Sequence, residues 1–338
     1  MKNTNHWSAK DLLQISGSYW QACTLHAGVK LNIFTLLGNG KITAEELAKK
    51  LDCSIRGITV LLNALVAMKL ITKKQIKATS IYANTTASKS LLSKDSQYYI
   101  GYMIMHHHHL VNPWSQLDQS IKTGKLIRDQ KIINTNKERE SFLMGMFNTA
   151  MNTAPQLAEE IDLSENRSLL DLGGGPGTYA IHFCLKNPSL KATVYDLPTT
   201  KPYAEKTIAR FGLSDRINFI SNNYLENDIS GSYDVAWLSH ILHGQGPENC
   251  QIIIDKTVSS LSDRGLLLIH DFILNDTLDG PLYPAIFSLN MLINTEYGRS
   301  YSEVQIKNML IRAGVSNIQR LSYQGHDNAS IIAGRVTT

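Results

Sequence analysis

Short apolar runs alternate with segments of helical pattern in the second half of the chain. From about residue 165 onward, seven runs are predicted to be strands, at residues 168–172, 191–195, 217–220, 235–239, 265–269, 318–321 and 330–334. Strands that alternate with helices make right-handed crossovers, so we predict a doubly wound, Rossmann-like α/β sheet. Ligands of such sheets bind at the carboxyl ends of the strands.

Residues 9 to about 100 show broad apolar helical faces and one small hairpin. Thr43 and Glu46 have the spacing of a capping box, which predicts a helix over residues 44–51. Ser54 is a candidate N-cap for the next helix, and Ile71 and Tyr82 lie in two short predicted strands. Helices followed by a hairpin indicate a winged-helix unit.

The segment between these regions is predicted to consist of connecting helices. It contains four consecutive histidines, at residues 106–109. Neighbouring residues on a helix point about 100° apart, so four in a row cannot converge on one ion, and we predict no metal site. The expected domains are a winged helix at 1–100, connecting helices at 101–160 and a catalytic domain at 161–338.

Composition restricts the classes of function. The 338 residues include 43% hydrophobic and 18% charged residues, with a formal net charge of +4. We find no dense basic patch, so we expect no nucleic-acid partner. The four cysteines are scattered, the N-terminus lacks a signal-peptide pattern, and no apolar run reaches the ~20 residues of a membrane span. These features predict a cytoplasmic protein with reduced thiols and no membrane partner.

A glycine-rich turn follows the first predicted strand of the sheet. Asp171 precedes Gly173, Gly174, Gly175 and Gly177, and Asp196 ends the next apolar run. Glycines permit a tight turn and a close approach of a ligand, and the second acid has about the spacing that reaches a ribose diol. This combination predicts an adenosine-type ligand.

The sequence of the same turn indicates which class of adenosine ligand it binds. No Lys-Ser/Thr pair follows the glycines, which argues against a phosphate-binding loop, and the glycine spacing fails the dinucleotide pattern. Asp171 would repel a pyrophosphate, whereas it suits a ligand with a cationic amino-acid end. We therefore predict S-adenosylmethionine as the cofactor.

Four segments together resemble one enzyme family. They are the glycine turn, Tyr-Asp-Leu-Pro at residues 195–198, His243, and Gly-Arg-Ser-Tyr-Ser at residues 298–302. Their order is similar to that in the class I, S-adenosylmethionine-dependent O-methyltransferases of the caffeate and acetylserotonin type, over nearly the whole chain. The resemblance implies a homodimer in which the winged-helix domain pairs two subunits.

The resemblance also implies a catalytic base. His243 corresponds to the catalytic histidine of the family, and a neutral imidazole suits the removal of a phenolic proton. Asp271 corresponds to the family's first supporting glutamate. The second corresponds to Ser300, which cannot stabilise an imidazolium, and Gly244 departs from the family pattern beside the base. Glu296 or Glu303 could compensate.

Further site residues carry over from the family. The expected cofactor contacts are Asp171, Gly173, Gly175, Asp196, Leu197, Asn223, Tyr224 and Ser239. The expected substrate pocket contains His109, Trp114, Met146, Phe147, Asn290 and Met291.

The predicted function is methyl transfer from S-adenosylmethionine to a hydroxyl group of an aromatic or similar small molecule. Two alternatives remain at this point. The first is a family member that binds S-adenosylmethionine but catalyses a reaction other than methyl transfer, which Ser300 and Gly244 motivate. The second is a DNA-binding regulator that uses the winged helix.

Overall fold

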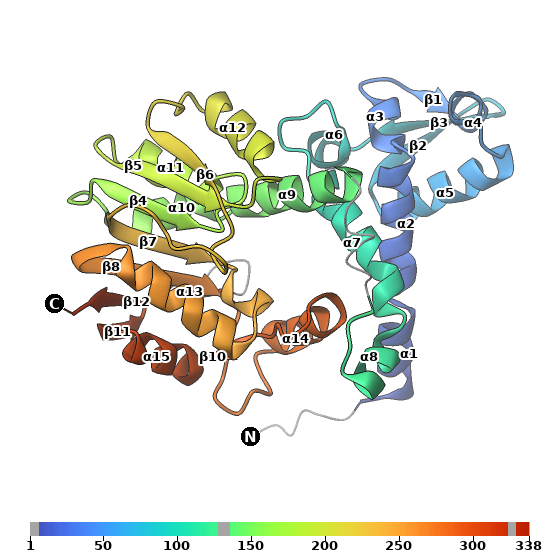
Figure 1. Cartoon of the computed structure of the whole chain (residues 1–338). Coiled ribbons are helices and arrows are strands. Elements are labelled where there is room, and N and C mark those ends of the chain that lie inside the picture. Colours follow the sequence, from blue (N-terminus) through green and yellow to red (C-terminus); the bar gives the residue numbers. More distant parts are fainter. Residues whose placement is uncertain (1–6, 128–135, 324–328, 338) are drawn as a thin grey trace. The chain divides into compact units, whose positions relative to one another are not determined.

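The structure is a computed structural model that describes residues 7–127, 136–323 and 329–337 (Figure 1). The chain divides into two compact units, Met1–His109 and Leu110–Thr338. Helix α7 (Gly101–Trp114) crosses this division, so the predicted connecting region, residues 101–160, contributes to both units.

The first unit combines helices with a small antiparallel sheet. Its remaining elements are α1 (Ala9–Gly17), α2 (Tyr19–Lys30), α3 (Ile33–Leu37), β1 (Ile42–Thr43), α4 (Ala44–Leu51), α5 (Ile55–Ala67), β2 (Ile71–Ile76), β3 (Thr79–Asn84) and α6 (Thr86–Leu92). The sheet order is β1-β3-β2. The predicted hairpin is confirmed as β2 and β3, whereas the two-residue strand β1 was not predicted because it is too short to show alternation.

Local sequence signals explain where these helices begin. Thr43 accepts a hydrogen bond from the Glu46 amide (3.1 Å), and Glu46 accepts one from the Thr43 amide (2.9 Å), which confirms the capping box. Ser54 caps α5, as predicted. Helix α5 then buries Ile58, Leu62 and Leu65, a spacing that places all three on one face.

Helix α1 differs from the others because none of its residues is buried. Large apolar side chains on and beside it are exposed, namely Trp7, Leu12, Leu13, Ile15, Tyr19 and Trp20. This exposed apolar surface is of the kind that marks a protein-interaction site.

The second unit is built around a seven-stranded sheet. Its strands are β4 (Ser168–Leu172), β5 (Lys191–Asp196), β6 (Ile217–Ser221), β7 (Tyr233–Ser239), β8 (Leu261–Asp271), β11 (Val315–Arg320) and β12 (Ser330–Val336). The order is β11-β12-β8-β7-β4-β5-β6. All seven predicted strands are confirmed, although β8 begins four residues earlier than predicted because it starts in a polar segment. Strand β12 is antiparallel to both neighbours, and the other pairs are parallel.

Helices cover both faces of this sheet, as the doubly wound prediction requires (Figure 1). Helices α10 (Ala154–Glu160), α11 (Thr178–Lys186) and α12 (Lys201–Arg210) share one apolar core with the sheet. Helices α13 (Pro247–Ser259) and α15 (Glu303–Arg312) share the other. Successive residues of β4 alternate between them, since Leu169 belongs to the first core and Leu170 to the second.

The remaining elements are α8 (Leu117–Thr123), α9 (Asn136–Met151), η2 (Leu242–Gly244), β9 (Ile273–Leu274), α14 (Leu282–Asn294) and β10 (Tyr301–Ser302). Strands β9 and β10 form a two-stranded parallel sheet that the sequence pattern did not predict. Two residues per strand give no detectable periodicity.

The capping box of α4 provides a test of the first unit. We expect Thr43→Ala to destabilise this helix locally by about 1 kcal/mol, because it leaves a helix N–H without its acceptor. Amide hydrogen exchange of residues 44–51 should become faster. Thr59→Ala is the control, since Thr59 donates to the Ile55 carbonyl within α5 and caps nothing. Unchanged exchange in Thr43→Ala would contradict the role of the cap.

Candidate active site

The turn after β4 requires its glycines. Gly173 and Gly175 have φ angles of 63° and 55°, which favour glycine. A Cβ atom at Gly174 would lie 2.5 Å from Cγ of Asp171, and no side chain fits in that space. A Cβ atom at Gly175 would meet no atom within 4 Å. The turn is therefore tight against Asp171 and open at Gly175.

Asp171 is fully buried at the end of β4. Its Oδ2 accepts from the Ala180 amide (3.2 Å) at the start of α11, whereas Oδ1 has no hydrogen-bond partner among the described residues. Burial raises the pKa of this carboxyl to about 7, although the Ala180 amide opposes the shift. A cationic group that donates a hydrogen bond would stabilise this carboxylate.

Asp196 lies at the end of the neighbouring strand β5. Its Oδ2 accepts from the Gly175 amide (2.8 Å), and its Oδ1 accepts from the Leu197 amide (2.6 Å). Burial raises its pKa, and these amides lower it. The structure thus brings together Asp171, Gly175, Asp196 and Leu197, four of the predicted cofactor residues, at one edge of the sheet.

The other predicted cofactor residues already have internal contacts. Asn223 uses Oδ1 to accept from the Leu225 amide (3.1 Å), so one lone pair of that oxygen is engaged. Tyr224 is half-buried, and desolvation raises its pKa to about 12. The hydroxyl of Ser239 lies 2.9 Å from Nδ1 of His270, a buried histidine whose pKa burial lowers.

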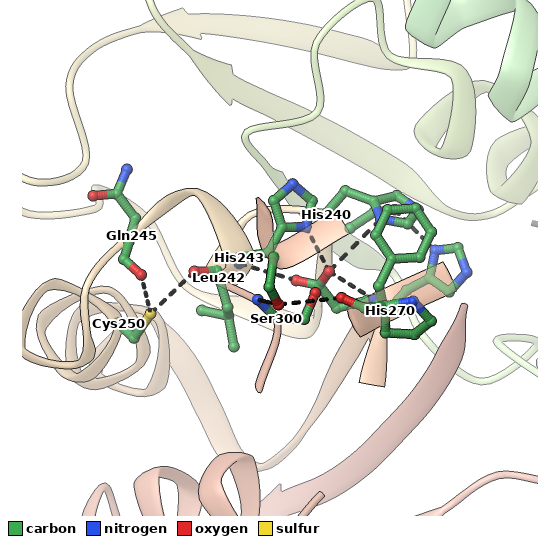
Figure 2. Close-up of polar contacts among 12 residues, drawn as sticks. His240, Leu242, His243, Gln245, Cys250, His270 and Ser300 are labelled. Carbon is green, nitrogen blue, oxygen red and sulfur yellow. Dashed lines mark hydrogen bonds and ion pairs between the residues drawn. The ribbon is translucent and has the colours of Figure 1, made fainter. Parts of the chain in front are cut away.

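His243 and Asp271 form a directly hydrogen-bonded pair (Figure 2). His243 lies on the short helix η2 that follows β7, and Asp271 ends the adjacent parallel strand β8. The two atoms Nδ1 of His243 and Oδ1 of Asp271 are 2.6 Å apart, and the His243 amide donates to Oδ2 (3.3 Å). An ionised carboxylate only accepts, so Nδ1 carries the proton.

The carboxyl group of Asp271 is shifted towards its charged form. Burial alone would raise its pKa, but the hydrogen-bonded His243 and the nearby His240 together lower it. The Phe272 amide also donates to its Oδ1 (2.8 Å). Asp271 therefore stays ionised and fixes the orientation of the His243 ring.

A second histidine faces the same carboxylate. Nδ1 of His240 lies 3.8 Å from Oδ1 of Asp271. Among the described residues, His240, His243 and Asp271 form a group whose potential metal-ligand atoms all lie within 4.8 Å of one another. In this structure, however, the hydrogen bond joins His243 to Asp271 directly, and the absence of a metal remains a prediction.

Two aromatic side chains that the sequence analysis missed pack on the His243 ring, and a third packs on them. Phe272 stacks on its ring (centroids 5.8 Å apart), and Phe287 packs edge-on against it (4.8 Å). Tyr283 in turn contacts Phe272 (5.0 Å). Phe272 follows Asp271 directly, and Phe287 precedes Met291 by four positions on α14, so adjacency and helical spacing were signals that could have identified them.

The predicted substrate residues are distributed over both units. Trp114 donates from Nε1 to Oδ1 of Asn290 (3.0 Å), which brings these two together. Phe147 and Met291 are buried, and Met146 is half-buried. His109 is the last residue of the first unit.

The two glutamates proposed as compensation for Ser300 do not make an equivalent contact. Glu303 pairs with Lys307 (2.7 Å) and Arg320 (3.4 Å), and Glu296 interacts with Tyr297. Ser300 itself is buried, and its hydroxyl has no hydrogen-bond partner within the described ranges. Asp271 is therefore the carboxylate that orients His243 in this part of the chain.

The helices of the described residues include none with the length and apolar character needed to cross a membrane.

Comparisons with known proteins place these features in a family. The sequence profile of an O-methyltransferase domain matches residues 128–316, and that of an O-methyltransferase dimerisation domain matches residues 13–94. The chain is 28% identical over 329 residues to a 3-hydroxy-5-methyl-1-naphthoate 3-O-methyltransferase of Streptomyces sahachiroi, with 96% of this chain and 94% of that protein covered.

Solved structures agree on the fold. An O-methyltransferase family protein from Burkholderia thailandensis is 26% identical, with a TM-score of 0.87 and 99% of both chains covered. Human N-acetylserotonin methyltransferase, solved with S-adenosylmethionine, gives a TM-score of 0.88 at 22% identity over the full length of both chains. The chain therefore belongs to the O-methyltransferase family and is an S-adenosylmethionine-dependent methyltransferase.

Proposed function

We propose that this enzyme transfers the methyl group of S-adenosylmethionine to a hydroxyl group of an aromatic small molecule, with His243 as the general base. The observation that carries this proposal is the 2.6 Å contact between His243 and the ionised carboxylate of Asp271, beside the aromatic rings that pack on His243.

The tautomer of His243 supports its role as base. Because Nδ1–H donates to Asp271, the neutral ring has its lone pair on Nε2. Methyl transfer from a sulfonium is an in-line displacement, and it requires an aligned acceptor whose hydroxyl loses a proton. Nε2 would accept that proton, and Asp271 would stabilise the resulting imidazolium.

The edge formed by β4 and β5 supports the proposed cofactor contacts. Asp196 would accept from the ribose hydroxyls with its remaining lone pairs, and Asp171 would face the amino-acid end of the cofactor. Gly173 and Gly175 would form the turn beside the ligand. The open space beside Gly175 supports this placement, whereas Ile241 fills the space beside Gly173. The remaining proposed contacts are Leu197, Asn223, Tyr224 and Ser239.

The proposed acceptor is a planar hydroxylated ring. Phe272, Tyr283 and Phe287 could stack on such a ring beside His243. The Streptomyces sahachiroi relative is named for a naphthoate acceptor, which is a ring system of this kind. The proposed pocket also includes His109, Trp114, Met146, Phe147, Asn290 and Met291.

We further propose that the enzyme works as a homodimer in the cytoplasm. The match of residues 13–94 to a dimerisation domain supports the dimer, and so do the exposed apolar side chains of α1. All four cysteines are free thiols, which agrees with a reducing compartment.

The ribose role of Asp196 can be tested by binding. We expect Asp196→Ala to weaken binding of S-adenosylhomocysteine by about 30- to 150-fold, because a charge-assisted pair of hydrogen bonds contributes roughly 2–3 kcal/mol. Calorimetry measures the dissociation constant. Asp234→Ala is a matched control, because Asp234 accepts from two backbone amides at the opposite end of β4. A dissociation constant for Asp196→Ala within two-fold of wild type would refute the ribose role.

The buried carboxyl of Asp171 predicts a pH dependence of stability. Its pKa is raised from 3.8 to about 7 on folding, so the folded state binds more protons between these values. Its contribution to the free energy of unfolding therefore falls as pH rises through this window. We expect Asp171→Asn to stabilise the ligand-free protein at pH 8 by on the order of 2 kcal/mol and to weaken cofactor binding. Urea unfolding from pH 4 to 8 measures the free energy of unfolding of both proteins. A difference between them that stays constant with pH would contradict the prediction.

The orienting role of Asp271 can be separated from that of Ser300. We expect Asp271→Asn to lower kcat by about 10²- to 10⁴-fold, because the amide no longer fixes the tautomer of His243. Affinity for S-adenosylhomocysteine should barely change, and Ser300→Ala should be nearly neutral. Transfer of labelled methyl groups to a panel of hydroxylated aromatics measures turnover. An active Asp271→Asn enzyme beside an inactive Ser300→Ala enzyme would place the support for His243 on the Ser300 loop instead.

A further inference from the structure

Two side chains outside the His243–Asp271 pair bind the turn that carries the base. The thiol of Cys250, on α13, donates to the carbonyl of Leu242 (3.2 Å) and lies 3.7 Å from that of Gln245. The hydroxyl of Tyr301 donates to the Gln245 carbonyl (2.6 Å). These two carbonyls flank His243 in sequence, and Figure 2 shows Cys250 between them.

Both donors are shielded from water. Cys250 is 0% exposed and Tyr301 is 2% exposed. Burial raises the pKa of the Cys250 thiol to about 11, and it also raises the pKa of the Tyr301 hydroxyl. Both groups therefore keep their protons at neutral pH and remain hydrogen-bond donors.

Tyr301 also connects this turn to the strand of Asp271. It lies in β10, where it pairs with Ile273 of β9, and β9 begins two residues after Asp271. Its side chain binds the His243 turn while its backbone strand pairs with the segment that follows Asp271. Tyr301 thus links the turn of His243 to the segment that follows Asp271.

The turn is closely packed on another side by the segment that precedes Tyr301. A Cβ atom at Gly298 would lie 2.6 Å from the carbonyl oxygen of His243, so the backbones are in close contact there. Movement of the turn in that direction is blocked. The hydrogen bonds from Cys250 and Tyr301 restrain it in addition to this contact.

We propose that Cys250 and Tyr301 are positioning residues that keep His243 aligned with Asp271. The proposal rests on the proposed role of His243 as base. Without these donors, the Gln245 carbonyl loses its side-chain partners and the Leu242 carbonyl keeps only the Gln245 amide (3.0 Å), so the turn is held less tightly and shifts. A small displacement of a general base has a large effect on rate, because proton transfer depends on alignment.

The test removes one hydrogen-bond donor at a time. We expect Tyr301→Phe and Cys250→Ala each to lower kcat by about 3- to 10-fold. The dissociation constant of S-adenosylhomocysteine should stay within about two-fold, because within the described residues neither side chain is hydrogen-bonded to a proposed cofactor residue. Cys250→Ser keeps a donor and should recover most of the lost turnover. The acceptor used is 3-hydroxy-5-methyl-1-naphthoate.

A second readout needs no acceptor. In the complex with S-adenosylhomocysteine, the Nδ1–H proton of His243 should give a downfield imidazole resonance, identified by its loss in His243→Gln and Asp271→Asn. We expect this resonance to broaden or vanish in Tyr301→Phe and Cys250→Ala, because the proton exchanges faster when the pair loosens. It should persist in Cys250→Ser.

Matched controls separate positioning from loss of stability. Tyr233→Phe removes a buried hydroxyl that donates to the Ser230 carbonyl (3.0 Å), and Cys184→Ala removes a buried thiol that donates to the Leu190 carbonyl (3.5 Å). Each should lower the melting temperature about as much as its counterpart while leaving kcat and the imidazole resonance unchanged.

The outcomes distinguish two failures. Wild-type turnover and an unchanged resonance in both Tyr301→Phe and Cys250→Ala would overturn the positioning role. Equal losses of kcat and of the resonance in the two controls would show a general effect of stability, and this result would also overturn the positioning role. Full activity of His243→Ala would instead refute the proposed base, and the resonance would still report whether the two donors hold the pair together.

Discussion

The parallel pairing of four neighbouring strands is the constraint on which the site depends. Strands β5, β4, β7 and β8 run in the same direction, and their registers place the last residues of each strand side by side. The side chains that follow these strands therefore meet at one edge. Asp196, Asp171, His243 and Asp271 are separated by up to 100 residues in sequence, yet each lies at or just beyond the end of one of these strands.

This convergence places three carboxyl groups close to the edge of an apolar sheet, and their pKa values shift in different directions. Burial raises the pKa values of Asp171 and Asp196, whereas the histidines beside Asp271 lower its pKa despite burial. The first two carboxyls favour a ligand that brings donors and positive charge, which a sulfonium cofactor with an amino group provides. The third already has histidine neighbours within the protein, and it orients His243, the proposed base.

The support around His243 differs from what the family resemblance implies. Ser300 replaces a carboxylate, and the next residue, Tyr301, donates to the carbonyl of Gln245 on the His243 turn. Orientation of the imidazole then depends on Asp271, and the backbone of the turn is restrained by neutral hydrogen bonds. A tyrosine hydroxyl stabilises a carbonyl without adding a charge to the buried site, so it avoids the cost of desolvating a second carboxylate.

The sequence by itself determined the strands, the glycine turn and the identity of the polar residues at the strand ends, because these depend on local periodicity and backbone freedom. The pairing of His243 with Asp271 was predicted from the family resemblance. The tertiary structure alone decided how Phe272 and Phe287 pack on His243, the contact between His240 and Asp271, and the hydrogen bonds from Cys250 and Tyr301. These contacts join α13, α14, β8 and β10 through side-chain packing, and no periodic signal records which residues of separate elements will touch.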